Sequence, residues 1–135
     1  MVALAPAGSS RPLPGILPVT LTFAWRRAVP TLFLVAERDR ATPLAGQREL
    51  YAGTPAPRWM FILRNAGHGH FGDQVDDAET CTRQAAQLFT RGLALTHLDG
   101  ALKADAAAHA FIASNVVALP RDRGVDAAAY RGDTG

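Results

Sequence analysis

Three short apolar runs, each bounded by proline, glycine or charged residues, predict three buried strands. They occupy residues 1–6, 29–37 and 58–66. A continuous apolar run of roughly four to eight residues is typical of a strand that is covered on both faces, as in a parallel sheet. The pattern therefore predicts an α/β fold with about three parallel strands and flanking helices.

The pattern changes to a helical period in three places. Residues 42–55 predict a helix with Pro43 in its first turn and Gly53 near its end. Residues 76–98 predict a long amphipathic helix, and residues 102–119 predict a shorter helix packed beside it.

Two segments carry no clear period. Residues 7–28 are rich in proline and predict a loop, and residues 121–135 predict a loose C-terminal tail. We therefore expect one domain over residues 1–120. Three parallel strands leave two unpaired sheet edges, so the pattern is typical of the C-terminal portion of a larger sheet whose N-terminal half is absent.

Composition narrows the class of protein. The chain has 135 residues, of which 48% are hydrophobic and 19% charged, as in one globular domain. Thirteen of its fourteen basic residues are arginines without a long block, and the net charge is only +2, which argues against a nucleic-acid-binding surface. No apolar run approaches the ~18 residues of a membrane span, and the N-terminus lacks the basic start of a signal peptide. A single cysteine, Cys81, forms no internal disulfide. We therefore expect a cytoplasmic protein that binds neither nucleic acid nor membrane.

Residues that could perform chemistry lie in the loops directly after the second and third predicted strands. The first loop, "AERDRATP", offers Glu37 and Asp39, and the second, "NAGHGHFGD", presents His68 and His70. Open α/β sheets place their sites at the carboxyl ends of the strands, where neighbouring loops meet. A carboxylate there can hold an imidazole in one tautomer and stabilise its protonated form. We expect Asp39 and His68 to contact each other, with Glu37 and His70 as the less favoured alternatives.

The His-x-His spacing also suits a metal ion. His68 and His70 could hold zinc with Asp73 as a third ligand, so a metal site stays open. His97 and His109 lie in predicted helices and are expected to be surface or packing residues. No glycine fingerprint for a nucleotide occurs, and no cofactor is expected.

The stretch "VPTLFLVAERDRATPLAGQRELYAGTPAPRWMFILRNAGHGHFGD" resembles the closing half of the α/β-hydrolase fold, above all its dienelactone-hydrolase-like and acetylhydrolase-like members. Asp39 and Pro43 match the family's "G-x-x-D-x-x-x-P" context, with Ala36 in place of the glycine. His68 in "NAGH" matches the family's "G-A-G-H". The resemblance covers about residues 29–114. It implies that Asp39 is the acid and His68 the base of a Ser-Asp-His triad that cleaves a carboxylic ester or lactone.

The nucleophile elbow of that family, "G-x-S-x-G", does not occur in the chain. The closest approach is "GSSRP", in which Pro12 follows too closely after Ser9 and Ser10 for a tight elbow and a helix. These two serines fit a loop better than a nucleophile. Cys81 and Ser114 come after the histidine loop, which is the wrong order for the family.

Three functions stay open at this point. The first is a portion of an ester hydrolase that is inactive alone and acts on a small-molecule ester when a nucleophile-bearing half completes it. The second is a non-catalytic module that pairs through its exposed sheet edge, giving a homodimer or a complex with another chain. The third, and least favoured, is a metal-dependent hydrolase that uses His68 and His70.

Overall fold

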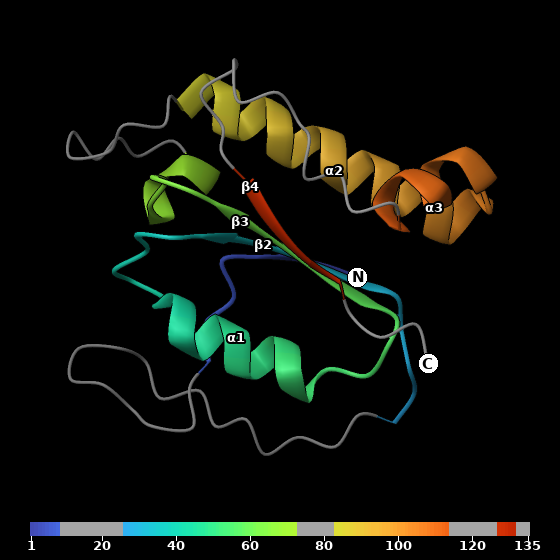
Figure 1. The fold of residues 1–135 in the computed structure, drawn as a ribbon, viewed down its shortest axis with the longest axis horizontal. Coiled ribbons are helices and arrows are strands. Elements are labelled where there is room, and N and C mark those ends of the chain that lie inside the picture. The colour runs from blue at the N-terminus through green and yellow to red at the C-terminus, as the bar shows by residue number, and fades with distance from the viewer. Residues whose placement is uncertain (9–25, 73–82, 114–126, 132–135) are drawn as a thin grey trace.

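The computed structural model describes residues 1–8, 26–72, 83–113 and 127–131 (Figure 1). Its elements, in chain order, are β1 (Val2–Leu4), β2 (Thr31–Ala36), α1 (Leu44–Gly53), β3 (Arg58–Leu63), the short 3-10 helix η1 (His68–Phe71), α2 (Arg83–Lys103), α3 (Ala106–Ala113) and β4 (Ala127–Arg131).

The strands form one sheet in the order β1-β2-β3-β4. β1, β2 and β3 are mutually parallel, and the register places Phe33 beside Met60. β4 pairs with the other side of β3 in the antiparallel direction. The three predicted parallel strands are therefore confirmed, and among the described residues the sheet remains open at β1.

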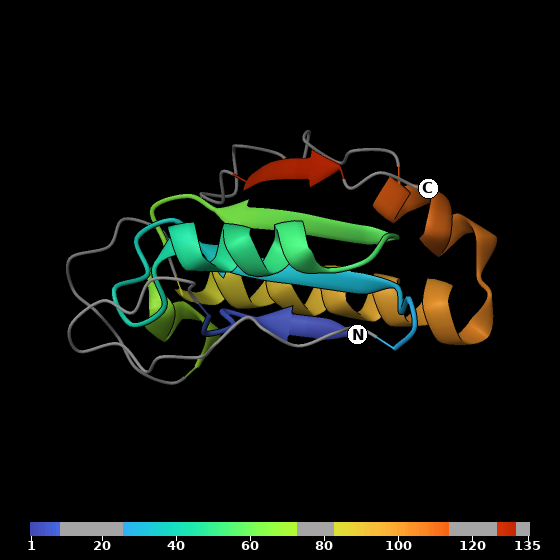
Figure 2. The same ribbon diagram turned by 90° about the horizontal axis from the view of Figure 1, so that it is seen from below.

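Helices cover both faces of this sheet. α2 and α3 lie on one face and α1 lies on the other, so the molecule has three layers (Figures 1 and 2). Successive residues of a strand point to opposite faces, which divides the apolar residues of β2 and β3 between two cores. Leu32, Leu34, Trp59 and Phe61 face α2 and α3, whereas Phe33, Val35, Met60 and Ile62 face α1.

The helix predicted over residues 42–55 is α1, and its first turn begins directly after Pro43. Proline suits this place because the first helical N–H groups have no partner within the helix. Gln47 is fully buried on α1, and this polar side chain belongs to the site described below. None of the described helices combines the length and apolarity that a membrane span requires.

The boundary between the two later helices differs from the prediction. α2 continues to Lys103 instead of ending at residue 98, and α3 begins at Ala106 instead of residue 102. Ala104 takes a positive φ of 54°, which ends α2, and the Asp105 carboxylate then accepts a hydrogen bond from Ala108 N at 2.9 Å. An aspartate cap thus starts α3. The hydrophobic pattern does not indicate this turn, because leucine and lysine continue the helical period across it.

Within the segment predicted as a loose tail, residues 121–135, the structure forms a strand at residues 127–131, β4, which pairs with the edge of β3. The segment "AAAYR" has little intrinsic strand preference. The segment pairs because β3 offers unpaired backbone N–H and C=O groups along that edge. The edge exists only in the folded sheet, so the local sequence does not predict the pairing. Most of the predicted loop over residues 7–28 lies outside the described residues, as do residues 76–82 of the first long predicted helix and residues 114–119 of the second.

Candidate functional site

The loops that follow β2 and β3 meet at one end of the sheet. Because β2 and β3 are parallel and in register, both chains leave the sheet side by side. Backbone bonds tie the two loops together: Glu37 N donates to Leu63 O at 3.0 Å, and Arg38 N donates to Ala66 O at 2.9 Å. Asp39 and His68 are thereby placed in adjacent loops.

Asp39 and His68 contact each other as predicted. His68 Nδ1 lies 2.8 Å from Asp39 Oδ2, so the imidazole donates this hydrogen bond from Nδ1. The aspartate side chain is completely buried, whereas the histidine side chain is 49% exposed. The bond leaves Nε2 as the ring nitrogen that can take up or release a proton, which is the arrangement of a general base held by a carboxylate.

Thr42 holds the Asp39 carboxylate together with His68. Its backbone N–H donates to Asp39 Oδ1 and its hydroxyl donates to Oδ2, each at 2.7 Å. The same hydroxyl lies 3.2 Å from the carbonyl oxygen of Ala5, just after the end of β1. Three hydrogen bonds on this buried carboxylate fix its orientation. Thr42 was not among the predicted site residues, although Asp-x-x-Thr is a spacing at which side chains bond to the nearby backbone.

Gln47 supports Thr42 in turn. Its side-chain amide donates to the backbone carbonyl oxygen of Thr42, and it also lies 3.3 Å from the Thr42 hydroxyl oxygen. The Gln47 Oε1 atom is buried and has no hydrogen-bond partner among the described residues. α1 therefore carries a polar residue into the core beside the Asp39 loop, and neither the spacing nor the composition of the sequence pointed to it.

The two alternatives to the predicted pair have different contacts. Glu37 accepts a hydrogen bond from Asn65 N at 3.0 Å through Oε2, which ties the two loops at a point away from His68. His70 is buried, and its Nδ1 accepts a bond from Gly67 N at 3.2 Å. That bond closes the first turn of η1 and so shapes the loop from which His68 projects.

No group of three metal-ligating side chains occurs in the part of the chain that the structure describes. Asp73, the third ligand of the expected metal site, lies outside that part. The same is true of all three serines and the cysteine, Ser9, Ser10, Cys81 and Ser114. The serine and cysteine residues that could supply a nucleophile from within the chain therefore have no described position.

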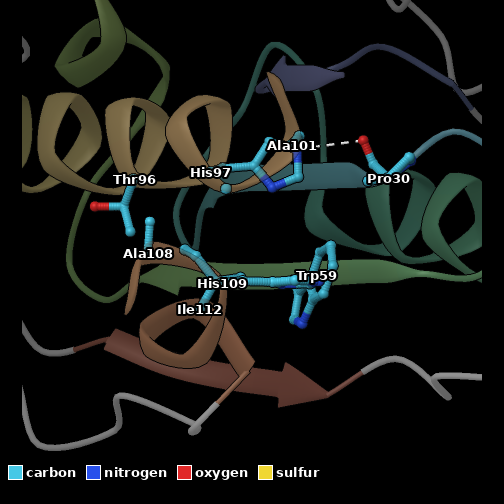
Figure 3. A pocket seen from close by; sticks show the side chains of 9 residues that line it. Pro30, Trp59, Thr96, His97, Ala101, Ala108, His109 and Ile112 are labelled. Atoms are coloured by element: carbon cyan, nitrogen blue, oxygen red, sulfur yellow. Dashed lines mark hydrogen bonds between the residues drawn. The ribbon is translucent and has the colours of Figure 1, made fainter. Parts of the chain in front are cut away.

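A second cluster of polar and aromatic groups lies at the opposite ends of the strands, between α2, α3 and Trp59 (Figure 3). It borders a cavity of about 220 Å³ whose walls include Pro30, Trp59, His97 and His109. His97 Nε2 donates to Pro30 O at 3.2 Å, and its ring contacts Trp59 edge to face at 5.6 Å between centroids. His109 contacts the same indole at 6.2 Å. His97 is buried, whereas His109 is exposed and contacts Trp59 from the surface, so both fit the expectation of surface or packing residues.

Burial lowers the pKa of His97 below its ordinary value of 6.5, and the positive charge of the amino terminus of the chain acts in the same direction. His97 is 3% exposed and has a neutral carbonyl oxygen as its partner. The neutral imidazole is therefore favoured at this place. The indole nitrogen of Trp59 is buried, and within the described part of the chain it has no hydrogen-bond partner.

Neither protein-family models nor curated proteins give a match to this chain.

Proposed function

We propose that Asp39 and His68 are the acid and the base of a Ser-Asp-His triad for the hydrolysis of a carboxylic ester or lactone. In this proposal His68 Nε2 takes the proton from a serine hydroxyl and later returns it to the leaving group. Asp39 keeps the imidazole in the tautomer that exposes Nε2 and stabilises its protonated form. The chain would then be part of an α/β-hydrolase domain.

The observation that carries the proposal is the 2.8 Å bond between a fully buried carboxylate and a half-exposed imidazole. An ion pair that only stabilises the fold does not require an exposed imidazole ring. A histidine that is only solvated in a loop does not require a buried carboxylate as its partner. The additional donors on Asp39 from Thr42 strengthen this reasoning, because they hold the carboxylate in one orientation while His68 stays accessible.

The proposed nucleophile comes from outside the chain. The sequence has no "G-x-S-x-G" elbow, and Ser9 and Ser10 are followed by Pro12. A nucleophile-bearing partner segment would complete the site, and the substrate would be a small ester. The bond type rests on the family resemblance of residues 29–114.

The rate of p-nitrophenyl acetate hydrolysis by the full chain tests whether His68 acts as a base. Water can attack this activated ester when a general base assists. We expect slow hydrolysis that depends on His68 and is at least tenfold faster than in His68→Gln, because general-base assistance contributes roughly 10²–10⁴-fold when geometry is favourable. His109→Gln is the matched control, since His109 lies in the cluster at the other end of the strands and should leave the rate unchanged. Equal rates for the wild type and His68→Gln would contradict the proposal.

A serine-directed fluorophosphonate separates the two possible origins of the nucleophile. We expect no covalent adduct on the chain alone, as judged by intact-mass spectrometry. An adduct at Ser9 or Ser10 that His68→Gln abolishes would show that the chain carries its own nucleophile and would overturn the external one.

A second candidate function is favoured by the open edge of the sheet. Among the described strands β1 is the outermost, and it pairs on one side only, with β2. Leu4 and Met1 near this edge are exposed. An extended segment of another chain could add to β1 through backbone hydrogen bonds, in which case the chain would be a non-catalytic interaction module. Binding of such a chain that survives Asp39→Asn and His68→Gln, together with no His68-dependent hydrolysis, would favour this candidate over the first.

A further inference from the structure

The outer face of α2 is apolar where a surface helix is normally polar. Leu88, Leu95 and Leu102 are 61%, 62% and 78% exposed, and Leu98 is 37% exposed. The opposite face of the same helix already covers the sheet through Ala86, Leu93 and His97. We call the four exposed leucines the leucine face. Within the described residues, α2 thus has one apolar side that packs on the core and a second apolar side that lies outside it.

The spacing of the leucine face is that of a helix which packs against another helix. Leu88, Leu95 and Leu102 are one heptad apart, and Leu98 lies at the d position that follows Leu95 at position a. Single exposed leucines are ordinary. A row of four at a/d spacing along one helix indicates a partner helix.

The two glycines of α2 support the same conclusion by contrast. A Cβ on Gly100 would lie 3.3 Å from the backbone nitrogen of His109, so this glycine allows the close approach of α3. A Cβ on Gly92 would meet nothing within 4 Å. Glycine in the middle of a helix is less favourable than alanine by about 1 kcal/mol. Within the described residues, no close contact explains why position 92 is glycine and not alanine. A second helix that crosses α2 at Gly92 would explain it.

The charges beside the leucine face are complementary to those of an antiparallel copy. Arg91 lies toward the N-terminal half of α2 and Asp99 toward its C-terminal half. In a parallel pair the two Arg91 side chains would meet and repel each other. In an antiparallel pair centred on Leu95, Arg91 comes to the height of Asp99 of the second copy. Asp99 uses Oδ1 in its bond to Lys103, at 2.6 Å, and a carboxylate can accept further bonds through its other oxygen.

We propose that the leucine face of α2 binds the leucine face of a second copy of this chain, with the two helices antiparallel. Leu95 lies next to the two-fold axis, Leu88 packs beside Leu102 of the second copy, and Gly92 admits the second helix. The contact is isologous, as expected for a two-fold dimer. It lies on the α2 side of the sheet, whereas the Asp39–His68 pair lies at the carboxyl ends of the strands, so the dimer leaves His68 accessible.

A single pair of helices buries less than the roughly 1,200 Å² that marks the lower limit of standard interfaces. We therefore expect a weak dimer with a dissociation constant on the order of tens of micromolar. Sedimentation velocity of the full chain at concentrations from about 5 to 500 μM should show a shift from monomer to dimer. A monomer at every concentration would overturn the proposal.

Substitutions at two exposed leucines show whether the dimer forms through the leucine face or through the open edge of β1. Leu95→Asp should weaken dimerisation at least tenfold without changing the circular dichroism spectrum, because the Leu95 side chain is 62% exposed. Leu4→Asp, at the open edge of β1, is the matched control and should leave the dimer intact. The reverse result would place the contact at the sheet edge and overturn the role of α2.

Disulfide cross-linking tests the orientation in a chain that carries Cys81→Ser. Leu95→Cys should form a covalent dimer on mild oxidation, because the two copies of this position meet at the axis. Leu88→Cys should cross-link with Leu102→Cys in a mixture and not with itself. Self-cross-linking of Leu88→Cys would show parallel helices and overturn the antiparallel arrangement.

Gly92→Ala separates the effect of helix propensity on the stability of the monomer from the effect of close helix contact on dimerisation. Alanine should raise the thermal midpoint of the monomer, because it is the better helix former, and at the same time weaken dimerisation severalfold by keeping the second helix away. Gly53→Ala is the control, since its added Cβ also meets open space but lies on α1. Unchanged dimerisation of Gly92→Ala would contradict the close approach at this residue.

Discussion

His68 and His97 are both hydrogen-bonded imidazoles at strand ends, yet their surroundings favour opposite uses. His68 donates to a buried carboxylate and is half exposed, whereas His97 donates to a neutral backbone carbonyl and is almost completely buried. The first ring has a carboxylate as its partner, together with access to solvent. The second has neither. The comparison shows that a hydrogen bond alone does not make a histidine a candidate base; the charge of its partner and the exposure of its other nitrogen decide.

The supporting residues differ in the same sense. Around Asp39 the chain places a threonine and a glutamine that orient a charge, and Thr42 touches both carboxylate oxygens. Around His97 it places an indole and a second imidazole, and both imidazoles pack edge to face on Trp59. The carboxyl ends of the strands thus hold an oriented polar network, and the amino ends hold an aromatic cluster that serves stability.

The largest effect is expected from Trp59→Ala, which breaks the aromatic cluster. Removing a buried tryptophan side chain lowers the free energy of unfolding by about 3–5 kcal/mol, and Trp59 is 4% exposed. The urea midpoint followed by circular dichroism should fall accordingly. Trp59→Phe keeps a ring beside His97 and should lose less. A loss below about 1 kcal/mol for the alanine variant would contradict the structural role of the cluster.

The next effect concerns the other side of the comparison, the Asp39–His68 bond. We expect Asp39→Asn to reduce the His68-dependent hydrolysis of p-nitrophenyl acetate toward the level of His68→Gln, by up to roughly 100-fold, which equals about 2.7 kcal/mol in activation free energy. The double variant should be no slower than either single one, because residues that act as a unit are not additive. Independent, multiplying losses would show that the two residues do not work together.

A smaller effect is expected at Thr42, which orients the acid. Thr42→Val removes the hydroxyl bond to Asp39 and should lower the free energy of unfolding by about 1–2 kcal/mol, together with a severalfold loss of hydrolysis. Thr42→Ser keeps the hydroxyl and should restore both quantities. A Thr42→Val chain that loses stability but retains the full rate would limit Thr42 to a structural role.

The smallest effect is the pH dependence that His97 gives to stability. Because burial lowers its pKa in the folded chain, the unfolded chain binds more protons below pH 6.5. The free energy of unfolding should therefore decrease as the pH falls from 7 through 6.5. The stability that the neutral His97 contributes is fully present above pH 6.5. His97→Phe should flatten the profile between about pH 5 and 7 in urea titrations. His109 and the amino terminus face the same ring, so His109→Phe serves as the comparison variant. An unchanged profile in His97→Phe would assign the dependence elsewhere.

Much of the sheet could be predicted because its strands are buried on both faces. Continuous apolar runs such as "TLFLVA" have no alternative to burial, and parallel strands need helical connections, so α1 followed as well. The turn at Ala104 and the strand β4 could not be predicted, because each depends on a partner that is distant in sequence or on a backbone conformation that no local pattern specifies.

The candidate site divides in the same way. The sequence determined which residues could perform chemistry: an aspartate and a histidine in the loops after two parallel strands, where the direction of the strands brings them to one end. Only the tertiary structure decided that the carboxylate is buried beneath Thr42 and Gln47 while His68 stays half exposed. Burial and hydrogen bonding depend on what the rest of the chain places around a residue, and α1 and the end of β1 supply those surroundings from elsewhere in the sequence.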